Sequence, residues 1–208
     1  MSLRLFVIRH GATDWSRERR FAGWRDVRLS DEGRRQCAAV AQALAGTNAA
    51  AVYASPLERT RVSAEVIAKP HRLTVQLADA FREMGFGAWE GLTRAEVAAR
   101  FPSEWDTWCA PPASFTPPGG EPLGAVAERV ARGLEDLTAD HDGETVILVT
   151  HAVVARLIVL AALGLGPERL WIVDAAPGGI SELEYRPDWV TVHRMNTVAH
   201  LSGMEALA

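Results

Sequence analysis

The run Val146–Val149 constrains the fold more than any other segment, because its four side chains are all apolar. Such a run is typical of a central strand in a parallel sheet, which helices cover on both faces. We predict a strand over 145–150 and a helix from there through Leu163. Further strands, separated by helical patterns, are predicted over 3–8, 50–54 and 73–77. This alternation predicts an α/β fold with a mostly parallel sheet and right-handed crossovers.

Three helix starts carry capping residues. Ser30 precedes a helix with an apolar stripe, which ends at Gly46. The segments 55–58 and 93–96 both show the capping-box pattern, in which Ser or Thr is followed by Glu three residues later. A longer amphipathic helix is predicted over 126–140. The alternating segments 180–185 and 189–195, joined by a Pro-Asp turn, predict a hairpin at the edge of the sheet.

Length and composition favour one globular domain over 1–208. The chain has 208 residues and is 48% hydrophobic, which is enough to fill a substantial core. The Pro- and Gly-rich stretch 110–122 cannot continue a helix or a central strand. We interpret this stretch as a loop or small cap rather than a linker, because about 110 residues before it and about 85 after it would each be near the lower size limit of a core.

Charge and cysteine content exclude several function classes. A net charge of −4 argues against a nucleic-acid partner, since such surfaces accumulate Lys and Arg. No apolar run reaches about 18 residues, and Arg156 interrupts the longest, so no membrane partner is expected. The N-terminus shows no secretory signal, and Cys37 and Cys109 are too few for a disulfide framework. We expect a cytoplasmic protein that is a monomer or a homodimer.

Polar residues of a few kinds follow three of the predicted strands. In open α/β sheets, ligands bind beyond the carboxyl ends of the strands, where loops lead into helices. We therefore expect these residues to converge at one edge of the sheet. They are Arg9, His10 and Gly11 after the first strand, Ser55 and Arg59 after the second, and Thr150 and His151 after the strand over 145–150.

A site that brings together two arginines and two histidines is suited to catalysing phosphoryl transfer. Arginine binds phosphate oxygens bidentately, and helix N-termini add backbone donors. A neutral imidazole can attack phosphorus and form a phosphohistidine, which divides one slow hydrolysis into two displacements. The sequence lacks a Walker-type glycine loop, an Asp-rich magnesium site and a His-Glu-x-x-His zinc motif. We expect no metal ion and no cofactor.

Together with further motifs, these residues resemble the histidine phosphatase superfamily, in its phosphoglycerate mutase-like branch. The resemblance implies a three-layer α/β sandwich with a small cap inserted after Glu83, over roughly 84–122. The motifs are Arg9-His10-Gly11-Ala12-Thr13, Gly23-Trp24, Leu29-Ser30-Asp31-Glu32-Gly33, Ser55-Pro56-Leu57-Glu58-Arg59-Thr60, Arg82-Glu83, Trp89-Glu90-Gly91 and Val149-Thr150-His151.

The resemblance also implies a role for each matching residue. His10 is the phosphorylated nucleophile, Arg9 and Arg59 bind the phosphoryl group, and His151 stabilises the transition state. Glu83 is the proton donor, since an alkoxide leaving group must receive a proton and a carboxyl group with a raised pKa can supply it. Further substrate contacts are implied for Gly11, Thr13, Ser16, Gly23 and the backbone amide of Ala152.

Three positions depart from the family pattern. Ala12 stands where many members have an acidic residue, Ser16 replaces an asparagine, and Ala152 replaces a glycine. None of these differences removes a charge from the proposed phosphate site, so they bear on substrate choice.

The favoured function is metal-independent hydrolysis of a small phosphorylated metabolite. Phosphoglycerate mutase-type transfer is the alternative, but such mutases carry an extended basic insertion, whereas 84–120 holds only Arg94 and Arg100 as basic residues. A non-enzymatic binding module is expected to have lost His10 or Glu83. Within the phosphatases, an α-ribazole phosphatase and a broad-specificity enzyme both remain open.

Two features have a structural and a functional interpretation. The basic stretch Arg17–Arg28 is either a solvated loop or a surface that steers anionic substrates. Trp105 and Trp108 stand three residues apart, and we expect them to pack the cap rather than form a ligand platform.

Overall fold

A computed structural model describes residues 2–112 and 115–202 of the chain. Within these residues, six strands form one sheet in the order β3-β2-β4-β1-β5-β6. The strands β1 to β4 are parallel, β5 is antiparallel to β1, and β6 is antiparallel to β5. The predicted mostly parallel sheet with an edge hairpin is confirmed. The strands are β1 (Leu3–Arg9), β2 (Ala51–Ala54), β3 (Val75–Leu77), β4 (Thr145–Thr150), β5 (Ile180–Tyr185) and β6 (Val190–Thr197).

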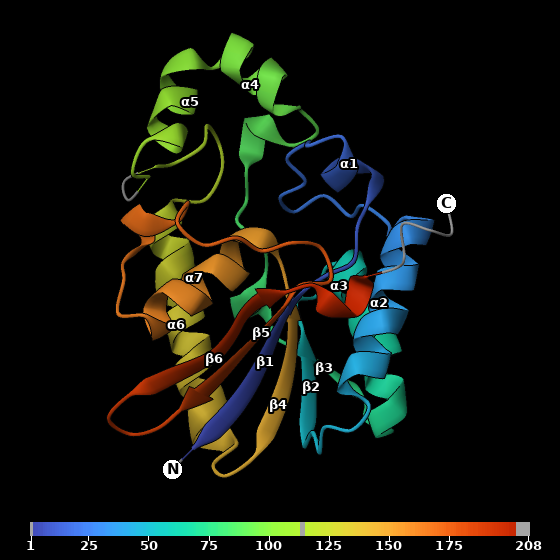
Figure 1. The fold of residues 1–208 in the computed structure, drawn as a ribbon. Coiled ribbons are helices and arrows are strands. Elements are labelled where there is room, and N and C mark those ends of the chain that lie inside the picture. The colour runs from blue at the N-terminus through green and yellow to red at the C-terminus, as the bar shows by residue number, and fades with distance from the viewer. Residues whose placement is uncertain (1, 113–114, 203–208) are drawn as a thin grey trace.

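Helices cover both faces of the sheet and complete three layers (Figure 1). One face packs against α2 (Asp31–Leu44) and α3 (Glu58–Ala68), and the other against α6 (Leu123–Asp140) and α7 (Ala152–Ala162). The remaining α-helices are α1 (Asp14–Arg17), α4 (Arg94–Arg100) and α5 (Pro102–Cys109). Short 3-10 helices are η1 (Lys69–His71), η2 (Asp79–Phe81), η3 (Gly87–Trp89), η4 (Pro167–Arg169) and η5 (Ala199–Leu201).

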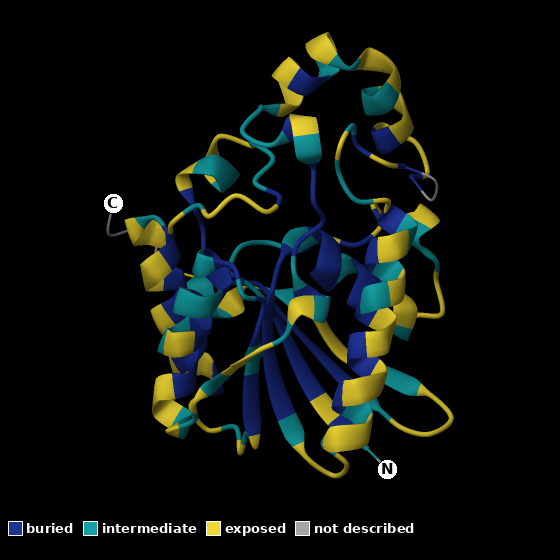
Figure 2. Ribbon diagram, turned by 180° about the vertical axis from the view of Figure 1, so that it is seen from behind, coloured by how far each residue is buried: buried dark blue, intermediate teal, exposed yellow. Residues whose placement is uncertain are grey.

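Alternate side chains of β1 belong to different layers of the core. Leu5 and Val7 pack with α6 and α7, whereas Phe6 and Ile8 pack with α2 and α3. Figure 2 shows the strands in dark blue between helices whose outer sides are exposed. Each fully buried Val, Leu, Ile or Phe contributes roughly 1.5–3 kcal/mol. Burial on both faces therefore fixes the carboxyl end of β1, where the sequence places the candidate nucleophile.

The segment after Glu83 forms a cap above the carboxyl ends of the parallel strands (Figure 1). It contains η3, α4 and α5, and its aromatic interior continues the cluster between the sheet and α6. Trp108 is buried there, with its ring 4.8 Å from that of Phe115. This residue packs the cap as predicted, although the sequence analysis did not predict α5 as a helix. Residues 113–114 of the predicted cap lie outside the described residues.

Two local predictions need correction. The capping box predicted at 55–58 is wrong, because α3 begins at Glu58 and its N-cap, Leu57, makes no side-chain cap. Ser55 instead turns its hydroxyl to His151. Helix α6 begins at Leu123, three residues before the predicted start. Ser30 caps its helix as predicted, and Thr93 forms the predicted capping box, since each side chain accepts from the backbone of its own helix.

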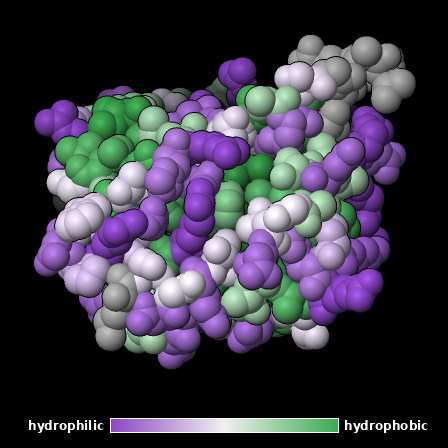
Figure 3. Space-filling view, turned by 60° about the horizontal axis from the view of Figure 1, so that its bottom comes forward, coloured by the Kyte–Doolittle hydropathy of each residue, from purple (hydrophilic) through white to green (hydrophobic). Residues whose placement is uncertain are grey.

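The surface mixes polar and apolar side chains. In the face shown in Figure 3, hydrophilic side chains form bands between smaller hydrophobic patches. Among residues 2–112 and 115–202, no helix combines the length and the apolar character that crossing a membrane requires.

Candidate active site

The candidate site lies in a crevice between the carboxyl ends of β1 and β4. After β1 the chain continues to α2 on one face of the sheet, and after β4 it continues to α7 on the other. Such a divergence opens a binding crevice at the strand ends. Arg9 pairs with Thr150 in the sheet, so His10 and His151 follow side by side. Their ring centroids lie 5.3 Å apart in an edge-on arrangement.

His10 is buried and held in one tautomer. Its Nδ1 lies 2.7 Å from the carbonyl oxygen of Gly11. Because a carbonyl oxygen only accepts, Nδ1 carries the hydrogen and Nε2 keeps a free lone pair. Burial lowers the pKa of His10 well below 6.5, and the charges of Arg59 and Arg9 add to this effect. The imidazole is therefore neutral at pH 7, the form that can attack an electrophile.

The loop after His10 packs directly on the start of α2. A Cβ on Gly11 would lie 2.3 Å from the carbonyl oxygen of Gly33, and one on Gly33 would lie 2.0 Å from that of Ala12. Ala12 also receives a hydrogen bond from Ser30 Oγ. Gly11 does not line the cavity described below, and its backbone nitrogen donates to Ser63 Oγ at 3.3 Å.

Arg9 and Arg59 bring two cations to the crevice. Arg9 donates from NH1 to the carbonyl oxygen of Ala175 at 2.6 Å. Arg59 donates to the carbonyl oxygens of Gly23 and Arg25 at 2.7 and 2.8 Å. The Nε of each arginine is buried without a hydrogen-bond partner among the described residues. Burial lowers the pKa of Arg9 to about 10, so the side chain stays charged at pH 7.

Gly23 adopts a left-handed backbone conformation, with φ of 50°. A Cβ there would lie 2.1 Å from a carboxylate oxygen of Glu90. Because only glycine adopts such a conformation without cost, Gly23 can present its carbonyl oxygen to Arg59 while it lines the cavity.

Glu83 places a buried carboxyl group opposite these cations. Its Oε1 accepts from the backbone of Met84 at 3.0 Å and its Oε2 from that of Val153 at 3.5 Å. Burial raises the pKa of Glu83 above its ordinary value of 4.5, although Arg59 opposes the change. A carboxyl group with a raised pKa can hold a proton for transfer.

A residue of helix α6 holds the backbone around Glu83 through hydrogen bonds. Arg129 donates to the carbonyl oxygens of Ala80, Arg82 and Glu83 over 2.6 to 3.1 Å, and its guanidinium also pairs with Glu121. Five donors in one plane can satisfy several acceptors at once. Arg129 thus fixes the chain that carries the carboxyl group without entering the cavity.

His151 is buried and pairs with Ser55. Its Nε2 lies 2.7 Å from Ser55 Oγ, while its Nδ1 has no hydrogen-bond partner among the described residues. Burial lowers the pKa of His151 well below 6.5, and Arg59 lowers it further. Ser55 Oγ also accepts from the backbone of Leu57 at 3.5 Å.

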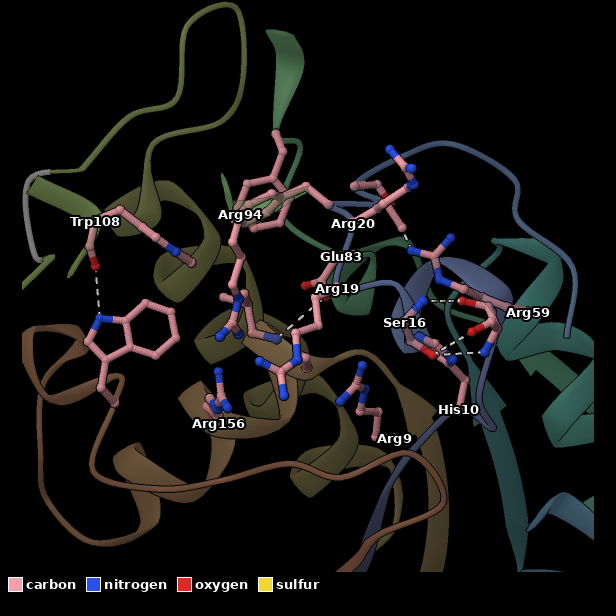
Figure 4. Close-up of a pocket in the computed structure, with 18 residues that line it drawn as sticks. Arg9, His10, Ser16, Arg19, Arg20, Arg59, Glu83, Arg94, Trp108 and Arg156 are labelled. Atoms are coloured by element: carbon pink, nitrogen blue, oxygen red, sulfur yellow. Dashed lines mark hydrogen bonds between the residues drawn. The ribbon is translucent and has the colours of Figure 1, made fainter. Parts of the chain in front are cut away.

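Arg9, His10, Arg59 and Glu83 line a cavity of about 200 Å³ (Figure 4), whereas His151 and Gly11 do not. Of the predicted substrate contacts, Thr13, Ser16, Gly23 and Ala152 line the cavity. The hydroxyl of Ser16 already donates to the carbonyl oxygen of Thr13 at 2.8 Å, so its hydrogen is engaged. Most of the basic stretch 17–28 is paired with carboxylates at the surface, but Arg19 and Arg20 reach the cavity wall.

Several residues of the wall, among them two arginines and a tryptophan, were not assigned to the site by the sequence analysis. Arg94, Arg156 and Trp171 line the cavity on the side of the cap, and Figure 4 shows the guanidinium groups of Arg94 and Arg156 directed inward. Arg156 follows Ala152 by four residues in α7, and this helical spacing was a usable signal. Trp171 lies in a loop with no motif, so nothing local indicated it.

Comparison with known proteins identifies one family throughout the chain. The model of the histidine phosphatase superfamily (branch 1) matches residues 5–198. Phosphoserine phosphatase 1 of Hydrogenobacter thermophilus is 31% identical over 96% of this chain and 94% of its own length. The bifunctional protein Rv2228c of Mycobacterium tuberculosis is 36% identical over 92% of this chain, which spans only 53% of that longer protein.

Solved structures show the same fold. Bacillus stearothermophilus YhfR superposes with a TM-score of 0.90 at 29% identity, covering 96% of this chain and 100% of that one. A putative alpha-ribazole-5′-P phosphatase from Escherichia coli gives a TM-score of 0.86 at 25% identity, covering 94% and 96% of the two chains.

Proposed function

This chain belongs to the histidine phosphatase superfamily, and we propose that it hydrolyses a small phosphomonoester through a phosphohistidine on His10. The observation that carries the proposal is the pairing of a neutral, correctly protonated His10 with two buried arginines and a buried carboxyl group in one cavity. Relatives named as phosphoserine and alpha-ribazole phosphatases support hydrolysis.

In the first step, Nε2 of His10 attacks phosphorus while the bond from phosphorus to the alcohol oxygen breaks. Arg9 and Arg59, which both line the cavity, bind the non-bridging oxygens through their guanidinium groups. Glu83 gives its proton to the departing oxygen. His151 lies beside His10, and its Nδ1, which has no hydrogen-bond partner among the described residues, is the atom that we propose donates to a phosphoryl oxygen.

In the second step, water attacks phosphorus and the bond from phosphorus to Nε2 breaks. The Glu83 carboxylate takes a proton from the water and returns to its acid form, as microscopic reversibility requires. Inorganic phosphate leaves and neutral His10 is restored. Arg9 and Arg59 supply the positive charge that the transferring group needs, so we propose that no metal ion takes part. In the described residues, no three His, Cys, Asp or Glu side chains group to hold a metal ion.

The test is to trap the intermediate. Protein treated with EDTA and mixed with a ³²P-labelled phosphomonoester should carry an acid-labile, base-stable label and release inorganic phosphate. His10→Ala should abolish both label and turnover, whereas the matched control His193→Ala, on the edge strand β6, should retain both. Full turnover by His10→Ala, or a requirement for added Mg²⁺ after EDTA, would overturn the proposal. Transfer of the label to an acceptor without phosphate release would identify a mutase instead.

A further inference from the structure

The loop between α7 and β5 makes contacts that hold Arg9 and His10. NH1 of Arg9 donates to the carbonyl oxygen of Ala175 at 2.6 Å, and this is the only hydrogen bond that its side chain makes with the described residues. The backbone nitrogen of Gly178 donates to the carbonyl oxygens of Arg9 and His10 at 3.0 and 3.3 Å. Arg59, by contrast, has two carbonyl partners for its guanidinium. The direction of the Arg9 guanidinium therefore depends on where this loop lies.

The loop itself is held by the C-terminal part of the described chain. Oδ1 of Asn196, near the end of β6, accepts from the backbone nitrogen of Ala176 at 2.7 Å. In η5, Nε2 of His200 lies 3.0 Å from the carbonyl oxygen of Gly178. Because a carbonyl oxygen only accepts, Nε2 donates this hydrogen bond. Figure 1 shows η5 in red beside α2. Two side chains of the segment 196–201 thus fix the loop at two neighbouring points.

Asn196 adopts a backbone conformation that residues other than glycine rarely take. Its φ is 46°, in the left-handed region, which asparagine tolerates better than most residues. A Cβ on Gly179 would lie 2.3 Å from Oδ1 of Asn196, so glycine at that position leaves room for the amide. Backbone strain of this kind persists only where the surrounding structure maintains it, and it clusters at functional sites. The unusual conformation of Asn196 therefore calls for a function of its side chain.

Pairing of the last two strands does not require these side chains. The ladder joins Ile180 to Thr197, and the backbone nitrogen of Asn196 donates to Ser181 Oγ at 2.9 Å. The side chains of Asn196 and His200 take no part in that ladder, and each bonds to a backbone atom of the loop instead. Closure of the sheet therefore does not explain why the two side chains converge on the loop.

We infer that Asn196 and His200 are positioning residues of the catalytic site, which hold Arg9 and His10 in place through the loop 175–179. The inference rests on the proposed hydrolysis and adds to it a segment that does not contact the substrate, since neither residue lines the cavity. Release of the loop lets the guanidinium of Arg9 turn away from the phosphoryl oxygens. Small displacements of such a group are costly, because about 1 Å can reduce the rate about 10²-fold.

The first test compares two substitutions of Asn196. Asn196→Gly keeps the left-handed backbone accessible and removes the acceptor, whereas Asn196→Asp keeps both. With para-nitrophenyl phosphate, Asn196→Gly should lose about tenfold in kcat/KM, part of the loss that a displacement of about 1 Å causes. Asn196→Asp should retain the wild-type kcat/KM. An equal loss in both variants would show that the side-chain oxygen does not act on the site, and the inference would be wrong.

His200→Ala tests the second contact without changing the strained turn. It removes the donor to Gly178 and should lower kcat/KM about three- to tenfold, the scale of one hydrogen bond. The matched control is His193→Ala, which removes a histidine of β6 that bonds to Glu184 at the surface. This control should retain the wild-type kcat/KM. Melting curves show whether each variant is folded, and His200→Ala decides the question if Asn196→Gly does not fold.

Binding of inorganic phosphate tests the same contacts without turnover. Its Kd, measured by isothermal titration calorimetry, should rise about threefold or more in Asn196→Gly and His200→Ala, because Arg9 no longer makes its full contact. His193→Ala should keep the wild-type Kd. Unchanged kcat/KM and Kd in Asn196→Gly and His200→Ala, even with lower melting temperatures, would overturn the positioning role and leave hydrolysis intact. If the wild-type protein releases no phosphate from para-nitrophenyl phosphate but the Kd values change as expected, the proposed hydrolysis fails and the positioning of Arg9 stands.

Discussion

The floor and the cap side of the cavity are built in different ways. On the floor, His10, Arg59 and Glu83 are buried, and backbone atoms hold each side chain through hydrogen bonds. On the cap side, Arg94 and Trp171 are exposed, and Trp171 contacts Trp108 of α5 and Arg156 of α7. Under the proposed mechanism, the floor carries out the chemistry of the phosphoryl group, whereas the cap side contacts the alcohol.

Burial explains the shifted pKa values of the acids and bases on the floor. Removing a charged group from water disfavours its charged form, which lowers the pKa of His10 and raises that of Glu83. Both shifts favour the protonation states that the first step needs. The chemistry therefore depends on the desolvated floor, and a change there should have larger effects than one in the cap.

The largest effect is expected for Glu83→Gln on the floor. The amide cannot donate a proton as an acid, so kcat for an alkyl phosphate should fall about 10²- to 10⁴-fold, the scale of general-acid catalysis. An aryl phosphate, whose leaving group departs without a proton, should lose much less. Equal losses for the two substrates, measured by phosphate release, would show that Glu83 acts in binding or structure.

The same variant should change the pH profile of the alkyl phosphate. The rate requires neutral His10, so it rises with pH through a pKa that burial holds well below 6.5. It also requires protonated Glu83, so it falls as pH rises through a pKa above 4.5. Glu83→Gln should lose the alkaline limb of this bell and keep the acid limb.

A smaller loss of kcat is expected for Gly33→Ala, because Gly33 contacts the loop that carries His10 through backbone atoms alone. The new Cβ would lie 2.0 Å from the carbonyl oxygen of Ala12 and push the loop that carries His10. Displacement by about 1 Å can reduce kcat about 10²-fold. The control Gly124→Ala, in α6, has no heavy atom within 4 Å of the added Cβ and should retain full activity. Equal kcat values for the two variants would contradict a rigid floor.

The difference between the floor and the cap side also explains which parts of the site could be predicted from the sequence. The strands β1 and β4 follow from short apolar runs, and Arg9, His10 and His151 follow from their position at strand ends, whereas Glu83 was indicated only by the family resemblance. Local patterns were enough there because the strand itself places the residue. At Ser55 the local pattern misled, because the hydroxyl found a better partner in His151, 96 residues away in sequence.

The cap side could not be predicted in this way. Trp171 and Trp108 meet across 63 residues, and the hydrogen bond between them has no sequence signature. The pairing of Arg156 with Trp171 likewise depends on how the loop after α7 returns to the cap. Specificity therefore depends on tertiary contacts, which one sequence does not encode in any local pattern.

The smallest effect is expected when an N-cap residue is replaced in one helix next to the floor and in one helix of the cap segment. Ser30 caps α2 and also donates to the carbonyl oxygen of Ala12 on the floor, whereas Thr93 caps α4 within the cap and contacts no floor residue. Ser30→Ala and Thr93→Ala should each cost about 1 kcal/mol of stability, seen as a melting temperature lower by roughly 2–4 °C. Only Ser30→Ala should also reduce kcat for para-nitrophenyl phosphate, by a few fold, because it loosens the loop that carries the nucleophile. A matching fall in kcat for Thr93→Ala would mean that the cap takes part in holding the phosphoryl group, and the division between floor and cap would be wrong.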